Sequence, residues 1–325
     1  MILAGDVGGT KILLEVGEMR RNRWEPVFER RYAADEVVHF EDVMKRFLEE
    51  LRRERPDAEP ITAGAVGVAG PRIGNCIKMT NRPWAVDGDL IAGRCGIPRF
   101  KVVNDLAASA AGVDCLDPRE IVTLQPGEPD AEEPRVVVGV GTGLGVAYIV
   151  PHGGKGKVVP GEGGHVGFAP ETPEQAELWR ALFTATGRVE VEDIVSGRGL
   201  ANVYDFIAKR GNAGLGLENA AADPAWISEQ ALSHGDAACE AALDLFSECL
   251  GNVAGNHALS VMARGGVFLA GGVVTKIAGA LHTPRFRQAF CSKGAFSSHL
   301  MRIPVHAVLT EKLPVIGAAR TALQE

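Results

Sequence analysis

Three short glycine-rich segments stand out because each follows an apolar stretch with the composition of a buried strand. Glycine lets the backbone approach a ligand closely and adopt positive φ, so several N–H groups can point at one anion. A threonine hydroxyl adds a donor in two of them. The segments are residues 6–10 (Asp-Val-Gly-Gly-Thr), 139–145 (Gly-Val-Gly-Thr-Gly-Leu-Gly) and 270–272 (Ala-Gly-Gly). Any one alone would more often be a tight hairpin, but the three together predict phosphate-binding turns.

The first of these turns carries a carboxylate, because Asp6 ends the apolar stretch that precedes it. A carboxylate there could hold the waters of a magnesium ion that bridges nucleotide phosphates. Two rival phosphate motifs do not fit. The chain contains no GxxxxGK[ST], which excludes a P-loop. Leu144 stands where a GxGxxG motif starting at Gly139 needs glycine, and a strand-like stretch follows, which disfavours a Rossmann site.

A second polar feature is the pair Asn104 and Asp105, which ends an apolar stretch. Ligands of open α/β sheets bind at the carboxyl ends of strands. If Asp105 accepts a hydroxyl proton there, it is the base of a phosphoryl transfer. The structural alternative is that Asp105 only caps a helix starting at Leu106.

Two further segments carry acidic side chains, and Glu162 and His165 of the first could bind vicinal hydroxyls. Glu162 and His165 flank two glycines that let the loop bend sharply, although an ordinary surface loop could have the same sequence pattern. Glu192 lies beside Glu190 and Asp193, and taken alone these three would be a solvated acidic patch.

Residues 80–84 (Thr-Asn-Arg-Pro-Trp) offer a hydroxyl, the Asn81 amide and an aromatic face, a common pattern at sugar sites, although Trp84 is more often a core residue. The chain has no GxSxG motif, and nothing indicates covalent catalysis.

Hydrophobic patterns predict the elements that must position these residues in the N-terminal third. Apolar side chains between residues 40 and 51 recur at i, i+3, i+4 and i+7, which predicts an amphipathic helix that Pro56 stops. Predicted strands cover residues 2–7, 12–16, 24–32, 63–68 and 100–103, and a helix covers 106–113. The strand, glycine turn and strand of residues 2–16 recur at 136–150, which suggests a repeated unit.

The rest of the chain is predicted to be mostly helical. Thr172 followed by Pro173 marks a helix start, with threonine as the N-cap and proline at the first helical position. Further helices are predicted at residues 200–207, 236–262 and the C-terminus, and strands at 267–270 and 305–309.

Length and composition limit the class of protein. At about 150 residues per domain, 325 residues predict two domains. The net charge of −7 argues against nucleic acid or an anionic membrane as the main partner. No apolar run approaches the ~20 residues of a membrane helix, and no signal peptide is expected. None of the six cysteines forms CxC or CxxC, so reduced thiols in the cytoplasm are expected rather than a zinc site.

Taken in order, the motifs resemble those of the bacterial ATP-dependent glucokinases. Each motif is weak by itself, but the ordered set is specific. The matching segments are residues 5–10, 79–84, 103–105, 141–147, 160–166, 168–170, 195–197 and 268–273. The resemblance implies an α/β protein with the two-domain hexokinase/actin-like (RNase H-like) ATPase fold and an inter-domain cleft that closes on sugar. It implies a small domain of residues 1–113 and 305–325 and a large domain of residues 114–304.

The resemblance also implies roles for individual residues. Asp105 would be the general base for the 6-hydroxyl of D-glucose, and Asp6 would hold Mg²⁺ through water. The substrate-binding set would be Asn81, Asn104, Asp105, Glu162, His165 and Glu192. The nucleotide-binding set would be Gly5, Asp6, Val7, Gly8, Gly9, Thr10, Gly141, Thr142, Gly143, Gly271 and Gly272.

Related sugar kinases carry a cysteine cluster for zinc after the Glu/His motif, but no cysteine lies between Cys115 and Cys239. The expected enzyme is therefore a zinc-free cytoplasmic glucokinase that uses ATP and Mg²⁺, forms a homodimer and binds neither nucleic acid nor membrane. The alternatives are a kinase for another hexose or one using polyphosphate. A non-catalytic sugar sensor is disfavoured because it would not need the Asp105 carboxylate.

Overall fold

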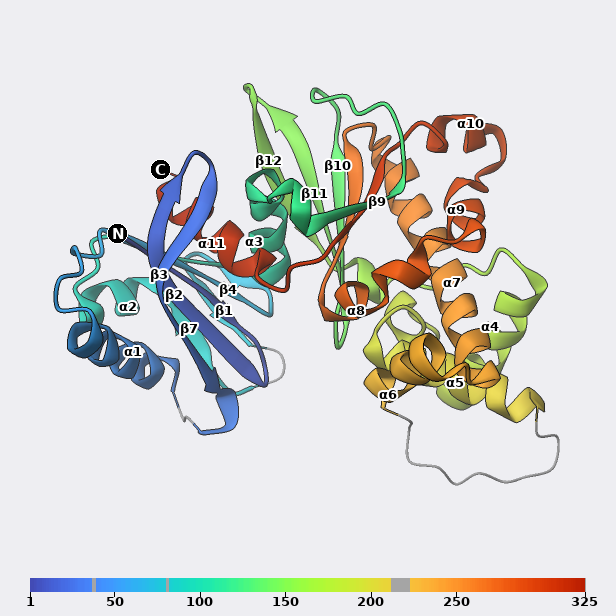
Figure 1. The fold of residues 1–325 in the computed structure, drawn as a ribbon, viewed down its shortest axis with the longest axis horizontal. Helices are drawn as coiled ribbons and strands as arrows, with labels where there is room; N and C mark the ends of the chain where they lie inside the picture. Colours follow the sequence, from blue (N-terminus) through green and yellow to red (C-terminus); the bar gives the residue numbers. More distant parts are fainter. Residues whose placement is uncertain (37–38, 80–81, 212–222, 325) are drawn as a thin grey trace. The chain divides into compact units, whose positions relative to one another are not determined.

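The computed structural model describes residues 1–36, 39–79, 82–211 and 223–324, and the chain divides into two compact units. Unit 1 comprises residues 1–118 and 312–325, and unit 2 comprises residues 119–311. Figure 1 shows both units as sheets with helices packed against them, which confirms the predicted α/β class. In the part of the chain that the structure describes, no helix has the length and apolar character needed to cross a bilayer.

Unit 1 is built on a five-stranded sheet of order β3-β2-β1-β4-β8, in which β1, β4 and β8 are parallel. The strands are β1 (Ile2–Val7), β2 (Lys11–Arg20), β3 (Arg23–Ala33), β4 (Ala63–Val68) and β8 (Phe100–Asn104). A small second sheet contains β5 (Arg72–Ile73), β6 (Cys76–Lys78) and β7 (Ala85–Asp87). The helices are α1 (Phe40–Glu54), α2 (Gly88–Cys95), α3 (Asp105–Gly112) and α11 (Leu313–Leu323).

The two faces of this sheet bury different side chains because successive residues of a strand point to opposite sides. Leu3 and Val7 of β1 pack with the buried stripe of α1. Ile2 and Ala4 face the other way and pack with apolar residues of α11. The α1 stripe is the one predicted from the periodicity of residues 40–51, and all six of its apolar side chains are buried: Phe40, Val43, Met44, Phe47, Leu48 and Leu51.

Helices α3 and α11 approach each other closely, and two glycines make this approach possible. A Cβ atom added to Gly317 would lie 1.6 Å from the carbonyl oxygen of Ala108, and one added to Gly112 would lie 2.8 Å from the carbonyl oxygen of Leu313. Neither position has room for a side chain. The close crossing therefore holds α3, whose first residue is Asp105, against α11.

Unit 2 is built on a six-stranded sheet of order β12-β11-β10-β13-β14-β9. The strands are β9 (Ile121–Gln125), β10 (Arg135–Val140), β11 (Leu144–His152), β12 (Lys155–Gly161), β13 (Gly266–Ala270) and β14 (Val305–Val308). The helices are α4 (Pro173–Thr186), α5 (Gly197–Gly211), α6 (Pro224–Glu229), α7 (Ala237–Val261), α8 (Gly272–Leu281), α9 (Pro284–Cys291) and α10 (Ser297–Leu300). The 3₁₀ helices η4 (Gly163–His165) and η5 (Val191–Asp193) belong to the candidate site.

The suggested internal repeat is visible in the two sheets. In unit 1, β1 pairs antiparallel with β2 and parallel with β4, and in unit 2, β10 pairs antiparallel with β11 and parallel with β13. In both units a glycine-rich turn joins the antiparallel pair and so lies at the carboxyl ends of the parallel strands. Each unit therefore presents its turn at the edge where α/β sheets bind ligands.

The unit boundaries differ from those expected. The resemblance implies that residues 305–311 belong to the small domain, but β14 pairs with β13 and β9 within the sheet of unit 2. Unit 1 instead extends to Pro118 and resumes at Lys312. A single buried strand near the C-terminus does not show in its own sequence which of two sheets it joins.

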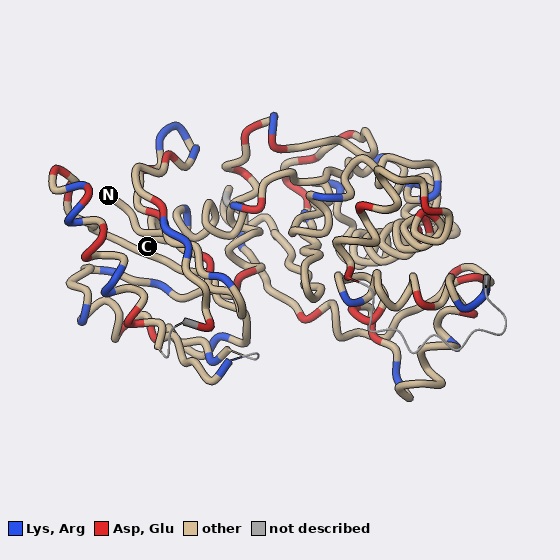
Figure 2. The backbone as a smooth tube through the Cα atoms, turned by 60° about the horizontal axis from the view of Figure 1, so that its bottom comes forward, with Lys and Arg blue, Asp and Glu red and all other residues tan. Residues whose placement is uncertain are grey.

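Charged residues of both signs occur in both units (Figure 2). Many are paired at the surface, as in the contacts of Arg20 with Glu18 (2.7 Å) and of Arg320 with Asp114 (2.8 Å). Lys312 contacts the buried carboxylate of Glu15 at 2.7 Å, which ties the start of α11 to β2. Exposed pairs of this kind contribute little stability, whereas the pair with Glu15 offsets the cost of burying a charge.

Candidate active site

The first glycine turn of unit 1 is held by backbone contacts on both sides. Gly8 N donates to Lys11 O over 2.9 Å, and Thr10 O accepts from Ala34 N over 2.9 Å. Gly5 and Val7 lie inside β1, and a Cβ on Gly5 would come within 2.5 Å of a methyl group of Leu14. Any contact of these two residues with a nucleotide would therefore be made by their backbone.

Asp6 and Asp105 lie near each other at the carboxyl edge of the sheet. The register pairs Asp6 with Gly67 of β4. Because Gly67 has no side chain, α3 packs directly on β4: a Cβ there would lie 3.3 Å from the Asp105 Cα atom. Burial first, and the charge of Asp105 second, raise the pKa of Asp6 to about 7, although part of Asp6 stays accessible. A pair of carboxylates in this state is suited to attract a cation.

The residue that caps α3 is Asn104 and not Asp105. Asn104 is the N-cap of α3, and its Oδ1 accepts from Leu106 N at 3.0 Å and from Ala107 N at 3.1 Å. Asp105 is the first helical residue, and its Oδ1 accepts from Leu106 N at 2.8 Å. Asn104 therefore orients α3, and its amide group also donates to Gly70 O over 3.3 Å.

Arg82 is a residue that sequence reasoning missed. Its guanidinium donates to Gly9 O in the turn and to Ala34 O at 2.9 Å, pairs with Asp35, and lies over the buried ring of Trp84. These contacts join the turn to the segment that follows Asn81. Asn81 itself lies outside the described residues. The sequence around Arg82 could not predict these contacts, because the backbone oxygens that accept from Arg82 lie far away in the chain.

In unit 2 two glycine turns lie side by side because they end neighbouring parallel strands. Gly139 of β10 is in register with Ala270 of β13. Gly271 has φ +99°, and a Cβ there would lie 2.4 Å from Val140 O, so only glycine fits. The helix α8 begins at Gly272, directly after this turn. A helix N-terminus next to glycine turns is a ready anion site.

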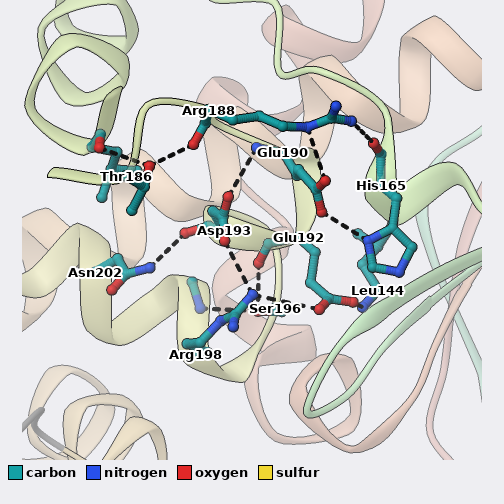
Figure 3. A network of polar contacts seen from close by, with 12 residues as sticks. Leu144, His165, Thr186, Arg188, Glu190, Glu192, Asp193, Ser196, Arg198 and Asn202 are labelled. Carbon is teal, nitrogen blue, oxygen red and sulfur yellow. Dashed lines mark hydrogen bonds and ion pairs between the residues drawn. The ribbon is translucent and has the colours of Figure 1, made fainter. Parts of the chain in front are cut away.

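The turn of residues 141–143 is supported from two further directions. Gly141 N donates to Gly143 O at 2.9 Å, and Gly197 N, at the start of α5, donates to Gly141 O at 2.8 Å. On its other side Leu144 N donates to Glu192 Oε2 at 2.8 Å (Figure 3). The carboxylate of Glu192 thus braces the predicted phosphate turn, and its other oxygen lies 3.5 Å from Arg198.

Glu162 and His165 are brought to the same part of unit 2 as Glu192. The loop carrying them packs directly on β11, because a Cβ on Gly164 would lie 2.1 Å from Leu144 O. Glu162 and His165 are exposed. His165 Nδ1 lies 2.8 Å from Glu190 Oε2. The predicted sugar-binding residues of this unit therefore lie beside its predicted phosphate turn.

Glu190 and Asp193 are more than the solvated patch that the sequence suggested. Glu190 N donates to Asp193 Oδ2 at 2.9 Å, and the two side chains form a capping box around η5. The usual sequence signature of such a box is Ser/Thr-x-x-Glu/Gln, which Glu-x-x-Asp does not match, so the box could not be predicted from the sequence. No local pattern could indicate that Glu190 also meets His165, because the contact joins two segments 25 residues apart.

Substituting Gly143 with alanine is expected to damage the phosphate turn. The new Cβ would lie 2.4 Å from Glu192 Oε2, which is held by Leu144 N, so the turn or the brace must move. Such overpacking costs about 1–3 kcal/mol, so we expect KM for ATP to rise about tenfold or more in steady-state assays. Gly279→Ala in α8 is the control, since nothing lies within 4 Å of its added Cβ. An unchanged KM for ATP in Gly143→Ala would contradict a role of this turn in nucleotide binding.

Two sheets of matching strand order, each with a glycine turn at its carboxyl edge, place the chain in the class of the two-domain actin-like ATPase fold. The particular family follows from comparison with known proteins. The family model described as Glucokinase matches residues 3–325, so the chain belongs to the glucokinase family and phosphorylates glucose with ATP.

Individual relatives agree along nearly the whole chain. The chain is 32% identical to a glucokinase of Nostoc sp. strain PCC 7120 over 341 aligned positions, covering 99% of this chain and 98% of the relative. Its fold is similar to that of a glucokinase from an Antarctic psychrotroph, with a TM-score of 0.85, 28% identity, and coverage of 99% and 98% of the two chains. A glucokinase from Balamuthia mandrillaris, solved with glucose, shares the fold, with a TM-score of 0.80, 22% identity and coverage of 99% and 93%.

Proposed function

We propose that the protein transfers the γ-phosphoryl group of ATP to the 6-hydroxyl of D-glucose, with Asp105 as the general base. The observation that carries this proposal is the place of Asp105: it begins α3 at the carboxyl end of β8, beside Asp6. Asp105 accepts the hydroxyl proton, the sugar oxygen forms a bond to the γ-phosphorus, and the bond between that phosphorus and the β,γ-bridging oxygen breaks to release ADP.

The glycine turns supply the nucleotide side of this reaction. Residues 8–10 of unit 1, and residues 141–143 and 271–272 of unit 2, offer backbone N–H donors for the phosphates, supported by the N-terminus of α8. Magnesium fits the paired carboxylates of unit 1, where Asp6 would hold it through water. When bound, it neutralises the charge that develops on the transferring phosphoryl group.

The family resemblance assigns the sugar side of the reaction to a set of polar residues. Glu162, His165 and Glu192 hold hydroxyls away from the phosphoryl acceptor, and Asn104 and Asn81 hold those near it. The exposure of Glu162 and His165 supports this role for unit 2. Because Oδ1 of Asn104 accepts both hydrogen bonds that cap α3, the contact of Asn104 with sugar would come from its amide N–H₂ group.

Zinc has no part in the proposal. In the part of the chain that the structure describes, no three His, Cys, Asp or Glu side chains are grouped to hold a metal ion. Burial raises the pKa of the Cys239 thiol to about 12 and also raises the pKa values of Cys115 and Cys291, so these thiols resist the deprotonation that zinc binding needs.

The family resemblance further supports a homodimer in the cytoplasm. Light scattering on the purified protein would measure its mass in solution and so test whether it is a dimer.

The test of this function compares hexoses and phosphoryl donors in one ADP-release assay. A site that hydrogen-bonds a hydroxyl discriminates against an analogue that lacks the hydroxyl at that position. We therefore expect kcat/KM for glucose to exceed the values for mannose, galactose and fructose by about tenfold or more, with ATP preferred over polyphosphate. Equal efficiency for glucose and mannose would indicate a broad hexokinase. A clear preference for fructose would reassign the substrate and leave the kinase chemistry intact.

A further inference from the structure

The exposed imidazole of His165 is held by a closed ring of contacts. Its Nδ1 lies 2.8 Å from one carboxylate oxygen of Glu190, and the other oxygen of that carboxylate lies 2.9 Å from Arg188 Nε. Arg188 Nη2 then donates to the backbone oxygen of His165 at 2.8 Å. Figure 3 shows these three residues together, with the second ring nitrogen of His165 directed away from Glu190.

The backbone holds this carboxylate opposite His165. The segment just after His165 pairs with the segment around Glu190: Phe168 N donates to Val189 O at 3.1 Å, and Val191 N donates to Val166 O at 2.9 Å. An antiparallel bridge joins Gly167 and Glu190 between those two bonds. The carboxylate is therefore fixed in place before any ligand binds, which lowers the entropy cost of orienting the imidazole.

This geometry settles which nitrogen of His165 carries hydrogen in the neutral ring. A carboxylate only accepts hydrogen bonds, so Nδ1 must donate to Glu190 and Nε2 is left to accept. The charges that face the ring are mostly acidic: Glu190, then Glu192 and Glu162, raise the pKa of His165. Arg188 is the cation in contact with Glu190.

We propose that Glu190, assisted by Arg188, is the positioning residue of the sugar site: it fixes the tautomer and direction of His165 so that Nε2 meets a glucose hydroxyl. The inference rests on the proposed role of His165 in binding sugar. Its chemistry resembles that of metal sites, where a carboxylate behind a histidine orients the ligating nitrogen. Glu190 itself touches no substrate in this scheme, so a substitution that keeps its cap on η5 should affect glucose and leave ATP alone.

The first test measures the free protein and does not depend on activity. We expect Glu190→Gln to lower the titration midpoint of His165 in NMR spectra, because the raised pKa depends first on the Glu190 carboxylate. The His165→Asn spectrum identifies the resonance. Glu177→Gln is the matched control, since that exposed carboxylate pairs with Arg210 elsewhere in unit 2. An unmoved midpoint in Glu190→Gln would overturn the inference whatever the kinetics.

The second test measures KM for each substrate. We expect Glu190→Gln to raise KM for glucose severalfold with KM for ATP within about twofold, because its amide oxygen can still accept from Asp193 N and keep the cap of η5. Adding Glu190→Gln to His165→Asn should change KM for glucose no further. An equal rise for both substrates, or no rise, would overturn the inference. A normal KM for glucose in His165→Asn alone would instead contradict the proposed role of His165.

Discussion

Replacing Asp105 with asparagine should lower kcat by a factor of about 10² to 10⁴ while glucose still binds. The amide oxygen can accept the Leu106 N–H bond that Asp105 makes at 2.8 Å, so the start of α3 should keep its geometry. The amide cannot take up the hydroxyl proton, and that step is lost. Steady-state kinetics and calorimetry of glucose binding would measure the two quantities separately.

The same variant has an internal check. Burial first and the charge of Asp105 second raise the pKa of Asp6, so neutralising Asp105 should bring that pKa closer to its ordinary value and should not destabilise unit 1. Abolished glucose binding together with a normal rate per bound sugar would show that Asp105 binds the substrate and is not the base.

Replacing Gly317 with alanine should cause the largest loss of stability. The new Cβ would lie 1.6 Å from Ala108 O, a backbone atom in α3 that cannot rotate away. Helices α3 and α11 must separate, at a cost of about 3 kcal/mol or more. For a unit of this size that corresponds to a fall in Tm of roughly 10 °C. Thermal and urea unfolding followed by circular dichroism would measure it.

A matched glycine in the same unit provides the control. Gly93 lies in α2, and nothing lies within 4 Å of the Cβ that alanine would add. Gly93→Ala should therefore stabilise unit 1 by up to about 1 kcal/mol, since alanine has the higher helix propensity. A similar loss of stability in both variants would mean that the close approach of α3 and α11 is not the cause. Activity should fall with Gly317→Ala because α3 carries Asp105.

Elements with a strong local pattern were predictable from the sequence. The stripe of α1, the N-cap at Thr172 and the strands before the glycine turns are all present in the structure. Each depends on residues within one element, where periodicity and capping preferences act directly. The short strands β9 and β12 and the helix α9 were not predicted. Their local patterns are weak, and their places depend on partners far away in the chain.

The candidate site shows the same division. Asp6, Asp105, Glu192 and His165 could be selected as candidate site residues from the sequence, because each belongs to a short motif whose residue types indicate its chemistry. The residue that caps α3 could not be predicted, since both Asn and Asp favour the N-cap position and only the structure shows that Asn104 occupies it. The supports of the site, Glu190 and Arg82, were missed because their value lies in contacts across the chain.

The split of unit 1 along the chain has a consequence during protein synthesis. Unit 2 is continuous, whereas unit 1 needs α11, which is translated only after all of unit 2. Until then the face of β1 and β4 that α11 covers, with Ile2 and Ala4, has no partner. We therefore expect unit 2 to fold first on the ribosome and unit 1 to close last, against the usual N-terminal order. The half-covered sheet of the nascent chain would be a natural binding site for chaperones in the interval.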